Sequence, residues 1–337
     1  MKILVVICTI LGVSQALSFS ELVRQEWNTY KLEHGKRYSN PREEQLRMEI
    51  FMENKMKIAK HNEKFEKGEV SYKMGLNQYG DMTHKEFVSM MTSPDRRLFK
   101  DELKEQRLRA EKFISRGDVS LPAAIDWREK GAVSRVKNQG SCGGCWAFGA
   151  TGAIESQYLI NGKNVSLSEQ NLIDCADDFG NLGCSGGFRN YAFDYIISNG
   201  GVDTEESYPY EAKDGRCRFN AKTIGATISS VVVLPEEDQQ ALKEALATVG
   251  PVGVAMDAGT ESFQFYTSGV FYDSSCHNDY YGLNHEVLAV GYGTENGDDY
   301  WIIKNSWGKS WGDAGYFKIS TRNNNCGIAT DTSYPVI

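Results

Sequence analysis

The segment spanning residues 139–148 constrains the chain most, because it places two cysteines and three glycines in a loop just before small and apolar residues of helical type. Its sequence is Gln-Gly-Ser-Cys-Gly-Gly-Cys-Trp-Ala-Phe. Two kinds of chemistry fit this pattern. Cys142 and Cys145 could form a redox-active dithiol, or one cysteine could be a nucleophile at a helix start while the other is a structural staple.

The first 16 residues are typical of a secretory signal peptide. Lys2 supplies a positive start, residues 3–13 an apolar run, and residues 14–16 a cleavage site of the small-x-small type. A membrane anchor would need about 20 apolar residues, so this run is too short, and no other segment could span a bilayer. We therefore expect export into an oxidising compartment.

The cysteine count points to one reactive thiol. The chain has eight cysteines, and Cys8 leaves with the signal peptide, so seven remain. An odd number in an exported protein leaves one thiol unpaired. Three disulfides and one free cysteine is the simplest solution.

Charge is distributed unevenly along the chain. Residues 18–120 contain 21 Lys/Arg and 18 Asp/Glu, a net charge of +3, whereas residues 121–337 contain 15 and 27, a net charge of −12. We expect the two parts to attract each other, and the attraction to weaken as carboxylates protonate. The alternative is a chance asymmetry between two soluble domains. Nucleic acid is not an expected partner, because the chain is acidic and no basic patch is interleaved with aromatic residues.

Helical patterns dominate residues 18–91. Ser18 with Glu21 fits a capping box, Asn40 precedes a proline and a glutamate suited to an N-terminal cap, and Gly68 is suited to end the second helix. One face of that helix mixes charged, amide and apolar residues spaced by three or four, which indicates that it makes particular contacts. These residues are Glu43, Arg47, Phe51, Asn54, Ile58 and Asn62.

Two further features precede residue 120. Residues 70–74 alternate like a strand, residues 75–81 form a turn, and Thr83 with Glu86 caps another short helix. Residues 94–118 are highly charged and lack periodicity, so we expect an exposed linker of the kind that proteases cut.

The character of the chain changes at residues 121–127. Beyond them we expect helices over residues 145–160, from Ser168, over 189–198 and over 237–248, and strands over 224–234, 252–257, 285–290, 300–305 and 316–320. A helical half followed by a mostly β half predicts an α+β fold with a cleft between the halves.

Cys145 is the candidate nucleophile. A thiol reacts as the thiolate, and a helix N-terminus with a nearby imidazolium lowers its pKa. His285 could be the base, Asn305 could orient its imidazole, and the Gln139 amide could stabilise an oxyanion. Taken singly, His285 could also be a buried structural histidine and Asn305 a turn residue.

Taken together, these residues resemble the papain-like cysteine peptidases, more specifically the cathepsin L type. The matching motifs are Gln139-Gly140, Cys142-Gly143-Gly144-Cys145-Trp146, Asn284-His285 and Lys304-Asn305-Ser306-Trp307-Gly308. The stripe from Glu43 to Asn62 and the turn over residues 75–81 resemble two propeptide motifs of the family. Gly144 stands where serine or alanine is usual, and Tyr79 where phenylalanine is usual. The resemblance covers essentially the whole chain.

The resemblance implies a signal peptide over residues 1–16, an inhibitory propeptide over residues 17–120 and a mature cysteine peptidase domain over residues 121–337. The mature part would have the papain-like two-domain fold, with a helical left domain, a β-barrel-like right domain and a cleft between them. Such a zymogen is activated by propeptide removal at acidic pH. The segments after Cys142 and around residues 177–183 are short, which favours an endopeptidase over exopeptidases whose loops block the cleft.

The resemblance also implies residue roles. Cys145 would attack as a thiolate paired with His285 and form an acyl-enzyme, while Asn305 orients the imidazole. Gln139 and the Cys145 backbone amide would form the oxyanion hole, and Trp307 would shield the Asn305–His285 bond. The implied disulfides are Cys142–Cys184, Cys175–Cys217 and Cys276–Cys326. This pairing leaves Cys145 free, in agreement with the odd cysteine count, whereas a redox dithiol would consume the nucleophile.

By the same resemblance, Gly186 and Gly187 line the cleft beside a pocket for the substrate residue two before the scissile bond. The lining residues of this pocket would be Phe188, Arg189, Ala255, Leu283, Glu286 and Asp331. Three of them are charged where the family usually has apolar or small residues. Our hypothesis is that Glu286 and Asp331 let the pocket accept arginine or lysine beside hydrophobic residues. The alternative is that Arg189 neutralises one of them and the pocket stays hydrophobic.

Asn164 begins a glycosylation sequon in an expected surface loop. The resemblance implies no cofactor and no metal. The expected partners are protein and peptide substrates, the chain's own propeptide and cystatin-type inhibitors; we expect a monomer in lysosomes or outside the cell, including a digestive lumen. A non-catalytic papain-fold binding or inhibitor protein is the alternative function, which loss of Cys145, His285 or Asn305 would have favoured. A thiol oxidoreductase ranks third.

Overall fold

The computed structural model describes residues 19–91, 93, 95–117 and 120–337. The expected signal peptide over residues 1–16 and the expected Ser18 cap lie outside these ranges. Before residue 120 the elements are α1 (Phe19–Glu33), α2 (Pro41–Glu66), β1 (Tyr72–Met74), α3 (His84–Met91), the 3₁₀ helix η1 (Arg96–Phe99), α4 (Lys100–Arg109) and β2 (Glu111–Lys112). Within the described ranges, no helix is long and apolar enough to cross a bilayer.

After residue 120 the order of elements is helical first and mostly β afterwards, which confirms the predicted α+β class. The first group is β3 (Ile125–Asp126), α5 (Cys145–Ile160), α6 (Glu169–Cys175), η2 (Asp177–Phe179), η3 (Gly183–Ser185) and α7 (Arg189–Asn199). The second group is β4 (Val202–Asp203), β5 (Ile224–Ala226), β6 (Ser230–Val233), α8 (Gln239–Thr248), β7 (Val252–Met256), α9 (Glu261–Gln264), β8 (Tyr266–Phe271), β9 (His285–Glu295), β10 (Asp298–Lys304), β11 (Tyr316–Ser320), η4 (Arg322–Gly327) and β12 (Thr332–Val336).

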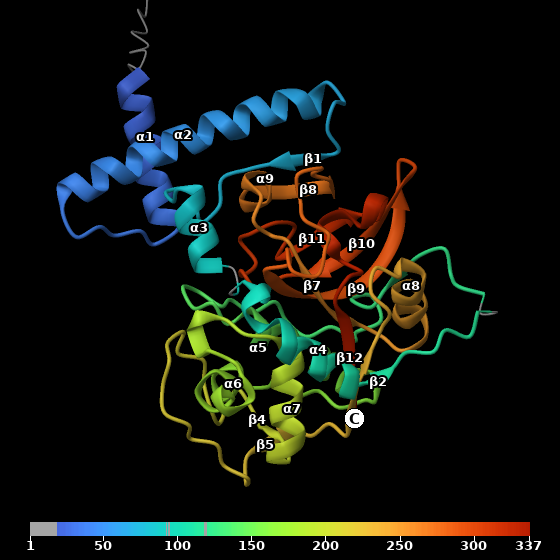
Figure 1. Ribbon diagram of the computed structural model, residues 1–337. Helices are drawn as coiled ribbons and strands as arrows, with labels where there is room; N and C mark the ends of the chain where they lie inside the picture. Colours follow the sequence, from blue (N-terminus) through green and yellow to red (C-terminus); the bar gives the residue numbers. More distant parts are fainter. Residues whose placement is uncertain (1–18, 92, 94, 118–119) are drawn as a thin grey trace, which may run out of the picture.

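A ten-stranded sheet joins the two parts of the chain. Its strand order is β1-β8-β11-β10-β9-β7-β12-β6-β2, with β3 paired to β9 off this path. Both end strands come from the part before residue 120: β1 pairs antiparallel with β8, and β2 pairs parallel with β6. In Figure 1 the long helix α2 lies across the top of the molecule beside β1, and the chain then descends through α3 to α4 and β2. The N-terminal part therefore covers both edges of the sheet.

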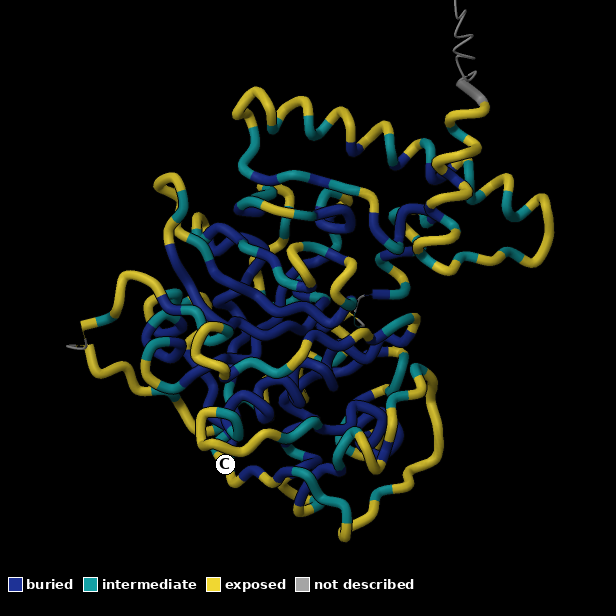
Figure 2. Tube along the Cα trace, turned by 180° about the vertical axis from the view of Figure 1, so that it is seen from behind, coloured by how far each residue is buried: buried dark blue, intermediate teal, exposed yellow. Residues whose placement is uncertain are grey.

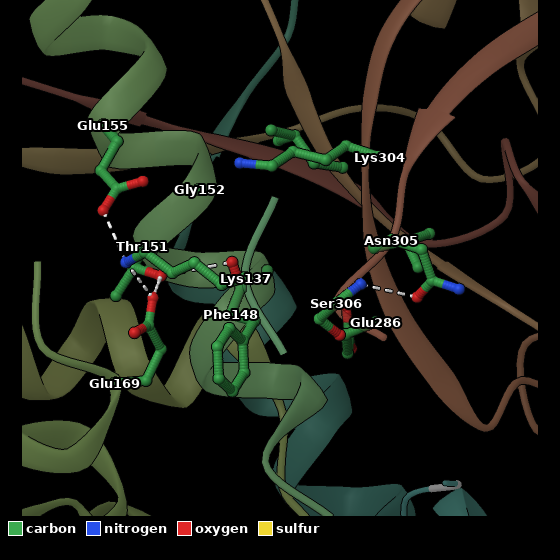
Figure 3. A pocket seen from close by; sticks show the side chains of 13 residues that line it. Lys137, Phe148, Thr151, Gly152, Glu155, Glu169, Glu286, Lys304, Asn305 and Ser306 are labelled. Carbon is green, nitrogen blue, oxygen red and sulfur yellow. Dashed lines mark hydrogen bonds and ion pairs between the residues drawn. The ribbon is translucent and has the colours of Figure 1, made fainter. Parts of the chain in front are cut away.

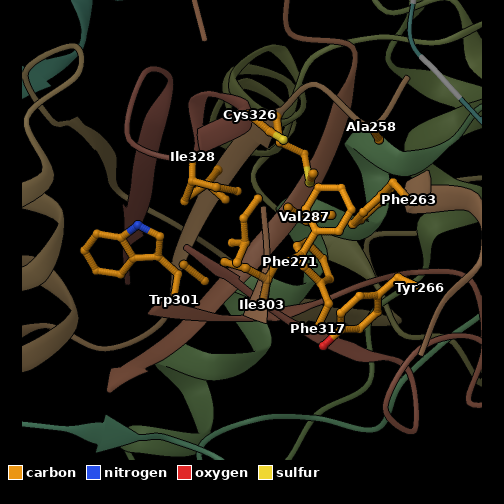
Figure 4. Packing of buried hydrophobic residues seen from close by; sticks show 14 of the residues in the cluster. Ala258, Phe263, Tyr266, Phe271, Val287, Trp301, Ile303, Phe317, Cys326 and Ile328 are labelled. Atoms are coloured by element: carbon orange, nitrogen blue, oxygen red, sulfur yellow. The ribbon is translucent and has the colours of Figure 1, made fainter. Parts of the chain in front are cut away.

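Strand β9 separates two hydrophobic cores. Its side chains alternate: Val287 and Ala289 belong to the core of the β half, and Leu288 and Val290 to the core that includes α5, α6 and α7. Figure 4 shows the first core, in which the ring of Phe263 packs edge-on against those of Phe271 and Phe317, with Cys326 in the same cluster. Figure 2 shows that buried chain is concentrated after residue 120, whereas buried and exposed residues alternate along α2.

Helix α5 packs closely on β9 because glycines face the strand. A Cβ at Gly149 would lie 3.4 Å from the Cβ of Glu286, and one at Gly152 would lie 3.4 Å from a methyl group of Leu288. The helix is buried from Cys145 to Gln157. Its first residue is therefore held in a rigid frame between the two halves.

The predicted stripe on α2 is confirmed as a contact face. The Asn54 amide donates to the Gly80 and Met82 carbonyls at 3.0 and 2.9 Å, and Asn62 exchanges two hydrogen bonds with Met74 at 2.8 and 2.9 Å. Arg47 pairs with Glu86 at 2.8 Å, while Phe51 and Ile58 are buried and Glu43 accepts from the Ser39 backbone. The polar residues fix the turn before α3, and the apolar ones bury the helix.

Residues 95–117 are largely exposed, as predicted, but the expectation of a linker without regular structure was wrong. They contain η1, α4 and β2, and Leu103 and Gln106 of α4 are buried. Arg96 is the most buried charge of the segment, with 2 % of its side chain exposed. Arg96 and Arg107 of this segment pair with carboxylates after residue 120, and the local sequence does not reveal such distant partners.

The structure also contains strands beyond those predicted, among them β8 and β12. Gly269 interrupts β8 with a positive φ of 86° where the strand passes the backbone of Ser71. Pro335 lies inside β12, and a residue without an N–H argues against a strand when read from sequence alone. Tertiary pairing with β1, β11, β6 and β7 overrides both signals.

Candidate active site

Cys145 is the first residue of α5 and directly follows the glycine-containing loop over residues 139–144. The loop is fixed by the Cys142–Cys184 disulfide and by the Gly143 amide, which donates to the Cys184 carbonyl at 2.9 Å. A Cβ at Gly143 would lie 2.6 Å from that carbonyl oxygen, so glycine is required there. The disulfides Cys175–Cys217 and Cys276–Cys326 are also present, and Cys145 is the free cysteine of the described residues. Because Cys142 is bonded to Cys184, a Cys142–Cys145 dithiol is excluded.

His285 begins β9 and lies against Asn305, which follows β10. The distance from His285 Nε2 to Asn305 Oδ1 is 2.9 Å, and the same oxygen accepts from the Ser306 amide at 2.8 Å. The amide oxygen of Asn305 therefore selects the tautomer with the proton on Nε2. Among the described residues, His285 Nδ1 has no hydrogen-bond partner. It is left available for a proton transfer.

Trp307 covers this pair. Its ring centroid lies 4.8 Å from that of His285, and its other neighbours are aromatic. Phe87 of α3 packs edge-on against Trp307 at 5.2 Å, and Trp311 does so at 4.8 Å. The indole is fully buried, so it excludes water from the His285–Asn305 bond.

Gln139 lies beside the nucleophile loop, as the sequence motif requires. Its Nε2 donates to the Cys142 carbonyl at 3.1 Å, and its Oε1 accepts from the Ser306 hydroxyl at 2.6 Å. These two bonds fix the orientation of the amide, with nitrogen toward the Cys142 loop and oxygen toward Ser306. Gln139 is fully buried.

The chain before residue 120 passes directly over Cys145. The Ser93 hydroxyl lies 3.3 Å from Cys145 Sγ and donates to the Gly187 carbonyl at 3.3 Å, while the Ser93 amide donates to the Asn284 carbonyl at 2.6 Å. These contacts connect the N-terminal part to both walls of the cleft. A substrate could not reach the thiol while Ser93 occupies this position.

The covered site is electrically neutral at the thiol and the imidazole. Burial raises the pKa of the Cys145 thiol to about 11, and burial lowers the pKa of His285 to about 4, against the opposing effect of its bond to Asn305. A thiolate–imidazolium pair is therefore disfavoured in the covered form. Solvent access after removal of the cover relieves the desolvation, and the N-terminus of α5 then favours the thiolate.

The residues expected to form the specificity pocket are all buried, and contacts join several of them. Ala255 pairs with Glu286 across β7 and β9, and its amide donates to the Asp331 carbonyl at 3.0 Å. Phe188 precedes α7 and follows Gly186 and Gly187, and Leu283 precedes β9. Arg189 contacts both carboxylates of the pocket: it pairs with Glu286 Oε2, and its Nη2 lies 3.0 Å from Asp331 Oδ1. Thus Arg189 contacts both carboxylates, whereas the alternative drawn from the sequence paired it with one, and its single charge balances only one of them.

A second arginine enters the same pocket from the propeptide. Arg96 Nη1 donates to Asp331 Oδ2 at 2.6 Å, and Nη2 donates to Glu286 Oε1 at 2.9 Å. Burial works against the charge of Asp331, but the guanidinium groups of Arg189, Arg96 and Arg107 hold the pKa of this carboxyl well below its usual range. The covered pocket therefore contains two arginines and two carboxylates.

A buried ionic cluster lies beside α5, in the same region as Asn305, Ser306 and Glu286 (Figure 3). Lys137 Nζ lies 2.8 Å from Glu155 and 2.6 Å from Glu169, beside a cavity of about 20 Å³ that Lys304 and Asn305 also line. Burial lowers the pKa of Lys304 to about 8. The cluster ties the loop before Cys145 to α5 and α6, and it is a positioning feature of the fold. Glu155, a lone charge in an apolar helix, was the sequence signal for it.

Sequence reasoning missed Ser93, Arg96 and Tyr280 as residues of the cleft. Ser93 lies just before the segment predicted to be a linker, Arg96 lies near its start, and Tyr280 lies in a loop without regular structure. None carries a local pattern that predicts burial against Cys145, Glu286 or Asp331. The exposed position of Asn164, between α5 and α6, agrees with the expected surface loop.

Comparison with known proteins supports the same assignment. The family model described as "Papain family cysteine protease" matches residues 121–336, and that described as "Cathepsin propeptide inhibitor domain (I29)" matches residues 27–87. A cathepsin L-like peptidase of Aedes aegypti is 51% identical over 341 residues, covering 100% of both chains, and a cathepsin L of Sarcophaga peregrina is 51% identical, covering 99% of each.

A solved structure shares the whole arrangement. The digestive procathepsin L 3 of the Tenebrio molitor larval midgut has a TM-score of 0.85 and 46% sequence identity, over 94% of this chain and 99% of that one. The propeptide domain and the peptidase domain occur together in both proteins, which identifies the N-terminal part as an intramolecular inhibitor. The chain belongs to the papain family of cysteine proteases, as a cathepsin L-like endopeptidase made as a zymogen.

Proposed function

We propose that Cys145 and His285 hydrolyse peptide bonds through a thiolate–imidazolium pair, with Asn305 and Gln139 in supporting roles. The observation that carries this proposal is the 2.9 Å bond between His285 Nε2 and Asn305 Oδ1, which leaves Nδ1 free, together with a free cysteine at the start of α5. The helix N-terminus stabilises the thiolate, and the asparagine bond stabilises and orients the imidazolium.

The reaction proceeds through a thioester. The Cys145 thiolate attacks the carbonyl carbon of the scissile bond, and the imidazolium of His285 transfers its proton to the departing amine as the C–N bond breaks. His285, now neutral, removes a proton from a water molecule as that water attacks the thioester. The C–S bond then breaks, which releases the carboxylic acid product and restores the Cys145 thiolate. The pair is restored without a cofactor.

Gln139 and the Cys145 backbone amide stabilise the oxyanion of the tetrahedral intermediate. The Gln139 amide is pre-oriented by Ser306 and Cys142, so its donor group needs no reorganisation when negative charge develops. Removal of one such donor typically lowers kcat by about 10²- to 10³-fold.

We further propose that acid favours activation. In the covered form, burial lowers the pKa of His285 from 6.5 to about 4. The covered form binds this proton more weakly than an open form with an ordinary histidine, so it is disfavoured as the pH falls from 6.5 towards 4. Each unit of difference in the His285 pKa between the two forms corresponds to about 1.4 kcal/mol in their relative free energy. Protonation of His285 therefore favours the open form, and the weakening attraction between the +3 and −12 parts acts in the same direction.

The processing and location of the protein follow from the same proposal. The signal peptide spans residues 1–16 and the propeptide residues 17–120, so that the mature enzyme begins near Leu121 and acts as a monomer on protein and peptide substrates, open to cystatin-type inhibitors. Asn164 carries a glycan. The Tenebrio relative, a digestive procathepsin L of the larval midgut, supports a digestive lumen, and a lysosomal location is the alternative.

Labelling with an irreversible epoxide thiol inhibitor tests the proposal. We expect the processed enzyme to bind one equivalent at Cys145, detected by mass spectrometry, and to lose peptidase activity in proportion. The intact zymogen should react far more slowly near neutral pH, because its thiol has a pKa of about 11 and is covered by Ser93. The Cys145→Ser chain is the control. A processed enzyme that cleaves peptides without labelling at Cys145 would contradict the assignment.

A further inference from the structure

Arg96 occupies a buried site whose acceptors are arranged to bind a guanidinium group. Its two acceptors come from different parts of the mature chain, Glu286 at the start of β9 and Asp331 just before β12. Both carboxylates are nearly inaccessible, with 2 % and 4 % of their side chains exposed, as is Arg96 with 2 %. Each of two guanidinium nitrogens donates to one carboxylate, at 2.9 and 2.6 Å.

Two aromatic rings complete this guanidinium-binding site. The guanidinium carbon of Arg96 lies 5.3 Å from the ring centroid of Phe188 and 4.9 Å from that of Tyr280. A planar guanidinium can contact both rings and still bridge two carboxylates with separate N–H groups. A lysine ammonium is a single point of charge with a different reach, so it cannot reproduce both bonds in this geometry.

Arg189 does not satisfy the acceptors that face Arg96. Arg189 pairs with Glu286 Oε2 and Asp331 Oδ1, whereas Arg96 uses Glu286 Oε1 and Asp331 Oδ2. When the propeptide leaves, one guanidinium faces two carboxylates. With both groups ionised the pocket then has a net charge of −1, although burial in the covered form raises the pKa of Glu286. Two carboxylate oxygens are left without a protein donor, and a substrate guanidinium can supply one to each.

We propose that the mature enzyme has an arginine pocket in this place, which selects arginine over lysine at the substrate position two residues before the scissile bond. Arg96 occupies the pocket in the zymogen as an internal stand-in for that substrate side chain. Asp331 and Glu286 recognise the two nitrogens, and Tyr280 is a specificity-determining residue because its ring stacks on the guanidinium. This inference rests on the proposed function of the cleft and adds its substrate class.

Reporter peptides that differ only at this position test the proposal. The activated enzyme is compared on Arg-Arg, Lys-Arg and Phe-Arg amide reporters, with its concentration fixed by titration with the epoxide inhibitor. We expect kcat/KM for Arg-Arg to exceed that for Lys-Arg by at least about tenfold, since a bidentate, stacked site discriminates between the two cations. Equal turnover of Arg-Arg and Lys-Arg would overturn the proposal.

Variants assign the selectivity to named residues. In Asp331→Asn the ratio of Arg-Arg to Phe-Arg turnover should fall by about tenfold or more, because one charged acceptor is lost. The Asp331→Asn change removes a charge that pairs with buried Arg189, which can impair folding. Tyr280→Leu therefore provides a second measurement at a half-buried residue. It should lower the Arg-Arg to Lys-Arg ratio by about threefold or more. The neighbouring Tyr281→Leu is the matched control and should leave the ratio unchanged.

The titration separates failure of this proposal from failure of the proposed function. Absence of a titratable Cys145 in processed protein would contradict the peptidase mechanism itself. Full titration with the same turnover of all three reporters, or a Tyr280→Leu variant that keeps the wild-type ratio, would leave the mechanism intact and overturn the arginine pocket.

Discussion

The side chains at the centre of the cleft are held by partners that lie far away in the sequence. Asn305 fixes His285 across 20 residues, and Ser306 fixes the Gln139 amide across 167 residues. Asn305 touches neither the thiol nor the expected position of the substrate. Its role is therefore to position the imidazole and to stabilise its charged form.

Replacing Asn305 by alanine tests this positioning role. We expect kcat/KM of the activated enzyme to fall by about 10²-fold, the lower end of what a well-placed general acid–base contributes, with most of the loss in kcat. The bond to Asn305 raises the pKa of His285, so its loss should also move the basic limb of the pH–rate profile to lower pH. Enzyme concentration is fixed by active-site titration.

A purely structural role for Asn305 predicts a different result. It would lower the fraction of titratable enzyme and leave the pH profile of the remainder unchanged. Asn164→Gln, at an exposed position, serves as the control and should preserve both kcat and the profile.

Single residues differ in how well the sequence predicts them. Cys145, His285, Asn305 and Gln139 stand in extended motifs, so the residues next to them in the sequence are enough to identify them. Arg96 and Tyr280 have no such context. Their burial depends on carboxylates and rings more than 80 residues away, and contacts over such separations leave no local pattern.

At the level of elements, the propeptide acts through the rigid connection between α2 and the turn before α3. The Asn54 side chain donates to two carbonyls in that turn, and α3 then presents Phe87 to Trp307. The turn leads to Ser93 over the thiol. An element that lies far from the cleft thus determines whether the cleft is covered.

Asn54→Ala should therefore loosen the zymogen. Two buried backbone acceptors lose their donor, at a cost of about 1–3 kcal/mol, which corresponds to about 5- to 150-fold more of the open form. We expect faster self-processing near neutral pH, followed by gel electrophoresis of purified zymogen. Lys60→Ala, on the exposed face of the same helix, is the matched control. Processing rates that match in the two variants would show that the turn does not control opening.

Regular elements are predictable where a segment carries its own periodicity. Helices α5, α7 and α8 and strands β7, β10 and β11 lie close to their predicted positions. Helix α4 and strands β2, β8 and β12 were missed, because their residues become ordered through pairing with distant segments. Arg107 of α4 illustrates this: it donates to the Leu234 carbonyl at 2.7 Å and pairs with Glu236 at 3.1 Å.

For the whole molecule, the charge difference between the two parts predicts how activation responds to pH and salt. The self-processing rate of the zymogen should rise as the pH falls from about 7.5 to about 4.5, because His285 gains a proton and carboxylates of the acidic part lose their charge. Glu86 is not the trigger, since its bond to Arg47 keeps its pKa at about 2.

Salt distinguishes the two contributions. At neutral pH, added salt should speed processing by screening the attraction between the parts, whereas at low pH it should have little effect. Zymogen carrying Cys145→Ser controls for cleavage by other proteases. Equal processing rates at the two pH values in low salt would refute the charge argument.

The pairing of β1 and β2 with the two ends of the sheet bears on how the protein associates with other chains before and after activation. An unpaired edge strand offers a row of N–H and C=O groups to any extended chain, including another copy of the same protein. The precursor pairs its own strands with β8 and β6, so neither is an edge strand while the N-terminal part is in place. Removal of that part with the cover of the cleft should leave β8 and β6 as edge strands, with backbone groups to which an extended chain can pair.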